Sequence, residues 1–366
     1  MAYLDKALVA TVLGDRELEY KYNSLALEKE KEAADLLRDH FDAEPTRSVL
    51  YRSAASIALK CDRPNLAEKL AAQGLSGNPP DDVAEELRIL FENITFHRHL
   101  KLEEMNLTRN SINITLFGND VAHGMVSIDE YIKRLKTLEQ ITMRTAERKR
   151  GRPYRSGGNP PKDIQKLLKP FLTLQKPASF SATIRFGSSQ MSLFDSDDFE
   201  ESFTDDVVHE VVETLENYEN GTTDKLSDRI DNDDYYINFI SLAKKLSPDG
   251  DSITKVGLST LKREKPVILE KPRDICMVVR EIVEKKADLD QIPNTTITGT
   301  LLYASKLRKK NPQIKIKPSK GKAEKVRVPV GMLDDIVRPL WDKQVIATVA
   351  PDKKNELLLV DIIEQE

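Results

Sequence analysis

The stretch SINITLFG, Ser111–Gly118, marks the place where the pattern of the sequence changes. Within it Ile112, Ile114 and Leu116 alternate with small polar residues. Alternation of this kind places the apolar side chains on one face of a β-strand. The hundred residues before it have helical patterns, and the residues after it mix strand and helix patterns. A domain built from both sheet and helix is therefore predicted to begin here.

The segment after this strand predicts helices and antiparallel hairpins in turn. Residues 127–151 predict a long amphipathic helix that begins with a capping box. Apolar and other residues alternate over 180–186, and a GSS turn follows. Met191 and Leu193 after the turn can pair with them, so a hairpin is predicted. A second hairpin is predicted over 252–272. Hairpins without βαβ repetition are typical of an α+β domain.

The C-terminal segment predicts a small barrel. Five short runs with β character within about seventy residues are typical of the OB or SH3-like kind. One short helix, 331–341, precedes the fourth run. The runs are 295–307, 313–318, 324–329, 344–350 and 356–363.

The predicted fold class is therefore α+β and multi-domain, because helical, mixed and strand-rich patterns follow one another along the chain. An all-helical, repeat-like module is predicted at 1–106 and an α+β domain with antiparallel hairpins at 107–290. A small, basic, five-stranded β-barrel is predicted at 293–366.

The composition is that of a soluble globular protein, with 32% charged residues and a formal net charge of −4. No apolar run approaches the roughly 18 residues that a membrane helix needs. We therefore expect no membrane contact and a cytoplasmic location. Cys61 and Cys276 are the only cysteines. This count excludes a disulfide framework and a cysteine-based zinc site.

The N-terminal module has small residues at a regular spacing. An aromatic residue, small residues and a terminal proline fall at Tyr51, Ala54, Ala55, Ala58, Ala67, Ala71, Gly74 and Pro79. Small residues let two helices approach closely, and the proline stops the second helix. Ala33 and Pro45 repeat the positions of Ala67 and Pro79 one period earlier. Residues 21–101 thus resemble a degenerate tetratricopeptide-repeat segment, and the resemblance implies binding of a protein partner. A purely structural helical cap is the alternative.

Acidic and basic residues occupy different segments. Residues 195–234 are rich in Asp and Glu, opposed only by Lys225 and Arg229, whereas 306–327 is basic and opposed only by Glu324. Such blocks create local fields that the net charge conceals. The alternatives are two solvated faces or two faces that meet each other.

The basic segment favours nucleic-acid binding, to DNA or RNA, because its strands alternate apolar with basic residues and display the charges on one face. Stacking aromatics are scarce in this part of the chain: Tyr303 and Trp341 are the only ones, and Trp341 is expected in the core. The predicted contacts are Lys315, Lys317, Lys320, Lys322, Lys325 and Arg327, with Arg150 and Arg152 from a second basic stretch.

That second stretch is RKRGRPYR, Arg148–Arg155, which contains the Arg-Gly-Arg-Pro core of an AT-hook. An AT-hook inserts its arginines into the narrow minor groove of DNA. The alternative is structural, because the stretch ends the predicted helix, Gly151 suits the position after a helix, and Pro153 prevents continuation. The structural interpretation is favoured.

The stretch QMSLF, Gln190–Phe194, closely resembles the peptide by which bacterial replication and repair proteins dock on the sliding clamp. The resemblance implies that Gln190 orders the peptide by hydrogen bonds and that Leu193 and Phe194 fill a hydrophobic pocket. It is also typical of a bacterial protein. The alternative is that this stretch is the second strand of the first hairpin.

No pattern predicts a catalytic residue, a metal ligand or a cofactor. His123 lies in a connecting loop without an identifiable partner. The stretch SPDGDSITK, with Asp249 and Asp251, faintly resembles the acidic layout of metal-dependent nucleases, but turn residues explain it equally. We therefore expect a non-enzymatic interaction protein, with partner binding by the helical module and nucleic-acid contact by the basic barrel. The alternative is a nucleic-acid-processing hydrolase or nuclease with its site in the middle domain.

Overall fold

The computed structural model forms two compact units, Met1–Leu102 and Glu103–Glu366. The residues that it describes are 2–13, 15–104, 107–119, 121, 126–174, 180–187, 198–263, 265–270, 272–284, 294–305, 312–319, 321–352 and 356–365.

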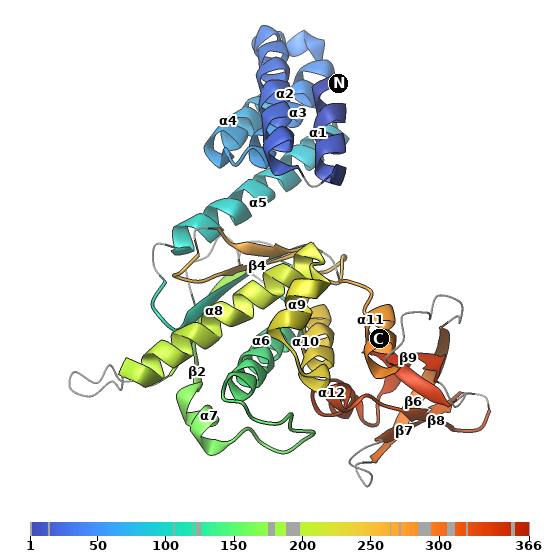
Figure 1. Ribbon diagram of the computed structural model, residues 1–366. Coiled ribbons are helices and arrows are strands. Elements are labelled where there is room, and N and C mark those ends of the chain that lie inside the picture. The colour runs from blue at the N-terminus through green and yellow to red at the C-terminus, as the bar shows by residue number, and fades with distance from the viewer. Residues whose placement is uncertain are drawn as a thin grey trace. The chain divides into compact units, whose positions relative to one another are not determined.

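The first unit consists of helices (Figure 1). Its core holds the small residues predicted to bring two helices together: Tyr51, Ala54, Ala58, Ala67 and Ala71 are fully buried. The helices are α1 (Ala2–Leu13), α2 (Arg16–Leu36), the 3₁₀ turn η1 (Phe41–Ala43), α3 (Thr46–Lys60), α4 (Pro64–Leu75) and α5 (Asp81–Glu104).

Helix α1 has an unusual distribution of side chains. It buries the small residues Ala7 and Ala10 and exposes the large apolar residues Leu8, Val9 and Leu13. Leu13 is 75% exposed and Leu8 is 65% exposed. A helix that only covered a core would turn its largest apolar side chains inward.

The second unit contains an antiparallel sheet in the order β2-β3-β1-β4-β5. The predicted strand at 111–118 is its central strand, paired with β3 on one side and β4 on the other. The strands are β1 (Ser111–Phe117), β2 (Pro170–Leu174), β3 (Phe180–Phe186), β4 (Lys255–Ser259) and β5 (Val267–Leu269).

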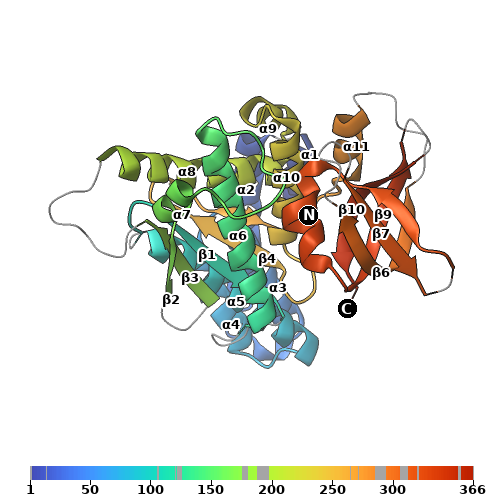
Figure 2. The same cartoon turned by 90° about the horizontal axis from the view of Figure 1, so that it is seen from below.

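One face of this sheet packs on helices. Ile112, Ile114 and Leu116 are buried in a core shared with α6 and α8, and Figures 1 and 2 show α6, α8 and α10 gathered over that face. The helices are α6 (Ile128–Lys149), α7 (Lys162–Leu167), α8 (Asp198–Asn220), α9 (Thr223–Arg229), α10 (Asp233–Leu246) and α11 (Cys276–Glu284).

The second sheet closes on itself in the order β10-β8-β7-β6-β9, because β9 also pairs with β10. Its strands are antiparallel except where β8 meets β10. The elements are β6 (Thr295–Ser305), β7 (Gln313–Pro318), β8 (Glu324–Arg327), α12 (Val330–Met332), the π-helical turn η2 (Leu333–Val337), the 3₁₀ turn η3 (Arg338–Leu340), β9 (Gln344–Pro351) and β10 (Leu357–Glu364).

Two local predictions are wrong. Strand β3 pairs with β2 and β1 on its two sides over the same residues, so it offers no edge to a strand at 190–194. The first hairpin is therefore β2–β3, and β2 was not predicted. The capping box also does not form: the Ser127 side chain makes no capping hydrogen bond, and the Glu130 carboxylate contacts Arg134 and Lys133.

The coarse prediction of mixed helix and sheet after a helical N-terminal region is confirmed. The second hairpin is confirmed as β4–β5. The division of the chain at Leu102 lies near the predicted end of the helical module. Residues 103–366 cluster as one unit, and the predicted boundary between a middle domain and a barrel at 290–293 stays a prediction.

Candidate nucleic-acid interface

Strand β7 displays its lysines outward. Ile314 and Ile316 are buried, while Lys315 and Lys317 alternate with them and are exposed. The neighbouring strand β8 adds Lys325, which stands directly opposite Lys315 in the ladder. Directly opposed side chains share a face of a sheet. Lys315, Lys317 and Lys325, which we call the lysine face, therefore form one surface, and exposed Lys322 precedes β8 in the chain.

The lysine face carries uncompensated charge. Like charges directly opposite each other in a sheet are destabilising. Among the described residues no carboxylate forms an ion pair with Lys315, Lys317, Lys322 or Lys325, whereas most other basic groups of the unit have such partners. Ammonium groups that repel one another and have no neighbouring carboxylate form a surface that attracts anions.

The two other predicted contacts of this segment, Arg327 and Lys320, do not belong to the lysine face. Arg327 lies 3.2 Å from the Asp352 carboxylate, which is buried, so its charge is largely neutralised. Lys320 lies outside the described residues. The strongest part of the predicted interface is therefore the lysine face rather than the whole basic segment.

Trp341 was expected in the core, and this expectation is wrong. The indole is 59% exposed at the end of η3. The turn that carries it is fixed to β6, because the Asp342 N–H donates to the Leu301 carbonyl (2.9 Å) and the Leu301 N–H donates to the Lys343 carbonyl (3.0 Å). The side chain of Tyr303 lies outside the described part.

The stretch RKRGRPYR ends α6 as its structural interpretation predicts. Gly151 has φ +66°, in the left-handed region that follows a helix. The Arg152 N–H donates to the Glu147 carbonyl (3.1 Å), and the Gly151 N–H donates to the Arg148 carbonyl (2.8 Å). These two bonds are the pair that defines a Schellman motif.

The arginines of this stretch are all engaged inside the protein. Arg148 lies 2.7 Å from the Glu210 carboxylate. Arg150 and Arg152 share Asp163, at 3.2 and 2.6 Å. Arginines paired with carboxylates of the same chain have a structural role already, so the predicted contacts of Arg150 and Arg152 with nucleic acid gain no support from their geometry.

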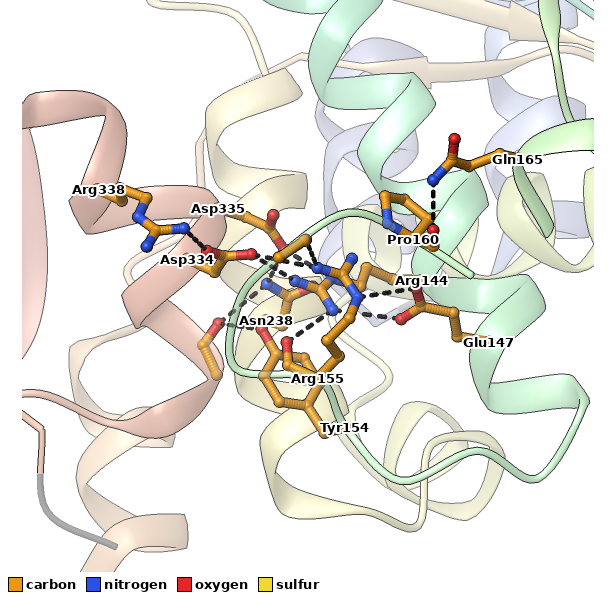
Figure 3. Close-up of polar contacts among 12 residues, drawn as sticks. Arg144, Glu147, Tyr154, Arg155, Pro160, Gln165, Asn238, Asp334, Asp335 and Arg338 are labelled. Atoms are coloured by element: carbon orange, nitrogen blue, oxygen red, sulfur yellow. Dashed lines mark hydrogen bonds and ion pairs between the residues drawn. The ribbon is translucent and has the colours of Figure 1, made fainter. Parts of the chain in front are cut away.

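The last arginine of the stretch belongs to a buried polar cluster around Arg144 (Figure 3). The Arg144 side chain is 5% exposed and lies 2.7 Å from Asp335, 3.2 Å from Glu147 and 3.4 Å from Asp334. Arg155 also contacts Glu147 and Asp334. The carboxylates of η2 are therefore held by guanidinium groups from α6 and the loop after it.

Neutral side chains complete this cluster. The Asn238 amide donates to Asp335 (3.0 Å) and to the Gly331 carbonyl (2.9 Å), which also accepts from the Tyr154 hydroxyl (3.1 Å). A Cβ atom on Gly331 would lie 2.4 Å from the Asp234 carbonyl, so only glycine permits this approach to α10. Burial raises the pKa of Tyr154, which stays a neutral donor. The cluster therefore joins α6, α10 and the C-terminal segment through buried polar contacts.

The acidic segment has partners of its own. Asp205 lies 2.9 Å from Lys262, and Glu216 lies 2.8 Å from Arg263, both in the β4–β5 connection. Arg229 lies 2.5 Å from Glu213. In the part of the chain that the structure describes, no ion pair joins 198–234 to 312–327. The two charge blocks therefore do not neutralise each other there.

Asp249, one of the two residues behind the predicted enzyme alternative, has structural contacts. The Asp249 carboxylate accepts from the N–H groups of Asp251 and Ile253 and lies 3.2 Å from Arg134, so it caps a turn. Within the described ranges no three His, Cys, Asp or Glu side chains gather where they could hold a metal ion.

The second face of the first sheet is polar and buried. Asn113 donates to Ser181 (2.9 Å) and Thr183 (3.3 Å), and Thr115 donates to Asn113 (2.9 Å). These groups are hydroxyls and an amide, which do not titrate near neutral pH and supply no general acid or base. The network satisfies its own members and identifies no reaction.

His123, Gln190, Leu193 and Phe194 lie outside the described residues. The sliding-clamp interpretation of Gln190–Phe194 stays a prediction, although its alternative as the hairpin partner of β3 is now wrong.

Two features of the interface were missed. The opposition of Lys315 and Lys325 depends on the register set by the β7–β8 connection, and the exposure of Trp341 depends on a contact with β6. Neither register nor that contact has a signal in the local sequence.

No protein-family model, curated protein or solved structure matches the chain. None of the helices described is long and apolar enough to cross a membrane.

Proposed function

We propose that this chain is a non-enzymatic interaction protein whose lysine face contacts the phosphate backbone of nucleic acid and whose helical unit binds a protein partner. The observation that carries the nucleic-acid part is the opposition of Lys315 and Lys325, with Lys317 beside them and no carboxylate partner among the described residues. The cytoplasmic location and the absence of a cofactor remain part of this proposal.

A phosphate backbone suits this surface for a physical reason. Phosphates brought near the lysine face replace a repulsion between ammonium groups with attraction, and condensed counterions are released from the nucleic acid. Lysine acts as a compact point charge without the planar fork of arginine. We therefore expect binding that depends strongly on salt and weakly on base sequence.

The arrangement of the second sheet is compatible with this role. Five short strands in a closed order with exposed charges on β7 and β8 support the interpretation as a small barrel of the OB or SH3-like kind. Barrels of this size are filled by side chains, so their ligands bind on the outer surface and the loops.

The protein-binding part of the proposal is supported by α1. Its exposed Leu8, Val9 and Leu13 lie on a helix that packs inward through alanines. Exposed apolar side chains gathered on one element are typical of a protein interaction site. Together with the tetratricopeptide-like spacing of α3 and α4, this surface supports partner binding by the first unit.

The nucleic-acid part is tested by fluorescence anisotropy with labelled single-stranded and double-stranded DNA and RNA over a range of salt concentrations. The wild-type chain should bind with an affinity that falls steeply with salt. Lys315→Glu with Lys317→Glu should weaken binding about 10-fold or more and lower the salt slope by about two. Lys162→Glu with Lys166→Glu changes the net charge equally at two exposed lysines of α7 and should have little effect.

Three results would overturn the proposal. If no nucleic acid binds, or if both double variants weaken binding equally, the lysine face is only a solvated surface. Metal-dependent cleavage of the strand, abolished by EDTA and by Asp249→Asn or Asp251→Asn, would instead establish the hydrolase or nuclease alternative.

A further inference from the structure

Trp341 is the only tryptophan of the chain, and more than half of its surface is exposed to solvent. Leaving so large an apolar ring in water forgoes the stabilisation that burial would provide. Its turn is nevertheless well fixed, since backbone hydrogen bonds join residues 342 and 343 to Leu301 of β6. The exposed ring is therefore carried by a turn that is fixed to β6.

The lysine face lies one strand away from this turn. Thr300 of β6 pairs with Lys317 of β7 on one side and with Gln344 of β9 on the other. Trp341 lies three residues before Gln344, the first residue of β9, and neighbouring strands are spaced by about 4.8 Å. Figure 2 shows β7, β6 and β9 side by side. The turn that carries Trp341 and the strand that carries Lys317 thus flank the same strip of β6.

Further lysines lie near Lys245 of α10. Burial lowers the pKa of half-buried Lys245 on α10, and the nearby charges of Lys133, Lys343 and Lys136 lower it further against the opposite effect of Asp335. Lys343 follows Trp341 by two residues and also forms an exposed ion pair with Glu364 (2.7 Å). Lys136 is exposed on α6. The segment that carries Trp341 therefore continues directly into Lys343, one of these lysines.

We infer that this strip binds single-stranded nucleic acid, with one base stacked on the Trp341 indole and the adjoining phosphates held by Lys315 and Lys317. The inference rests on the proposed function and specifies its ligand. Single strands expose the faces of their bases, whereas a duplex keeps them inside its own stack. An aromatic ring flanked by cations is the combination that binds single strands with little sequence preference.

The single tryptophan provides the test. We would titrate the full chain with an unlabelled oligothymidylate of about 16 nucleotides, which covers one small barrel, and follow the tryptophan emission. Stacking should quench this emission in proportion to binding, and anisotropy of a labelled copy of the same oligonucleotide reports binding independently. A duplex of the same length should bind through phosphates without quenching.

Two variants sharpen the experiment. Trp341→Ala should weaken binding of the single strand about 10-fold and leave the salt slope and duplex binding unchanged. Trp341→Phe should recover part of the loss, because a smaller ring still stacks. Circular dichroism should show that both variants fold, as expected for an exposed side chain.

The outcomes separate this inference from the proposed function. Salt-dependent binding that is lost in the Lys315→Glu and Lys317→Glu variant, without quenching and without an effect of Trp341→Ala, would overturn the stacking inference and keep the proposed function. If duplex quenches the tryptophan emission as much as the single strand does, and Trp341→Ala weakens duplex binding equally, the inference that the ligand is single-stranded is overturned. Absence of any nucleic-acid binding would overturn both.

Discussion

The stretch RKRGRPYR and the strands β7 and β8 are both rich in positive charge, and the structure treats them in opposite ways. In the first, Arg148, Arg150 and Arg152 each lie within an ion-pair distance of a carboxylate. In the second, Lys315 and Lys325 face each other without such a partner among the described residues. Similar local charge therefore serves internal structure in one region and remains available to a ligand in the other.

The difference arises from the kind of element that carries the charge. The arginines end a helix beside α7 and α8, which supply the carboxylates of Asp163 and Glu210. The lysines stand on a sheet where every second residue points outward and the register fixes the opposing residue. A basic sequence consequently indicates a binding surface only once the acidic residues around it are known.

The largest effect is expected from Arg144→Ala, which tests whether the arginine-rich region is structural. Removing this buried guanidinium takes away the arginine that pairs with Asp335 and one of the two that pair with Glu147, and we expect a loss of about 3–5 kcal/mol in the free energy of unfolding. Urea unfolding followed by circular dichroism measures it.

Arg338→Ala is the matched control, because Arg338 contacts Asp334 of the same cluster from an exposed position. It should cost well under about 1 kcal/mol. Equal losses in both variants would contradict the role assigned to the buried cluster.

A smaller effect is expected from Gly151→Ala in the Schellman motif. No atom lies within 4 Å of the added methyl group, so the cost comes from the positive φ alone, about 1–2 kcal/mol. Thermal unfolding measures this change. Gly151→Asn should retain most of the stability, since asparagine tolerates this conformation. If alanine proves as stable as asparagine, the stretch does not depend on its helix-ending geometry.

Lys325→Glu should change stability and binding in opposite directions. Replacing a repulsive pair with Lys315 by an attractive one should raise the free energy of unfolding by about 0.2–1 kcal/mol. The same change should weaken nucleic-acid binding. Lys322→Glu, in the connection before β8, should weaken binding without raising stability. A loss of stability in the Lys325 variant would argue that Lys325 has a structural partner.

The smallest effect is expected from Arg150→Ala with Arg152→Ala. Because Asp163 holds both side chains, nucleic-acid affinity measured by anisotropy should not change. A loss comparable with that of the Lys315 and Lys317 double variant would revive the minor-groove interpretation. It would also remove the contrast between the two basic regions.

Local patterns predicted what depends on local physics. The alternation in β1, β3 and β7 identified those strands, since a two-residue period needs only one buried face. Pairing is different: the alternation of β3 fits any antiparallel neighbour, and the true partner β2 begins at Pro170, which made that run unlike a strand.

The candidate site was predicted in outline for the same reason. Alternation identified outward-facing lysines, but the opposition of Lys315 to Lys325 follows from register, and the exposure of Trp341 follows from its turn on β6. The partners of Arg144 lie at Asp334 and Asp335, far along the chain, and no local period reports a contact at that separation.

The position of Asp335 in the chain gives the buried cluster a consequence during synthesis. Arg144 and Glu147 are made early, whereas the carboxylate that meets Arg144 lies 191 residues later. Until Asp335 leaves the ribosome, the Arg144 guanidinium on α6 lacks this carboxylate partner. We therefore expect chains that stop before Asp334 and Asp335 to leave Arg144 without these two partners, and to be cleaved by protease faster than the full chain.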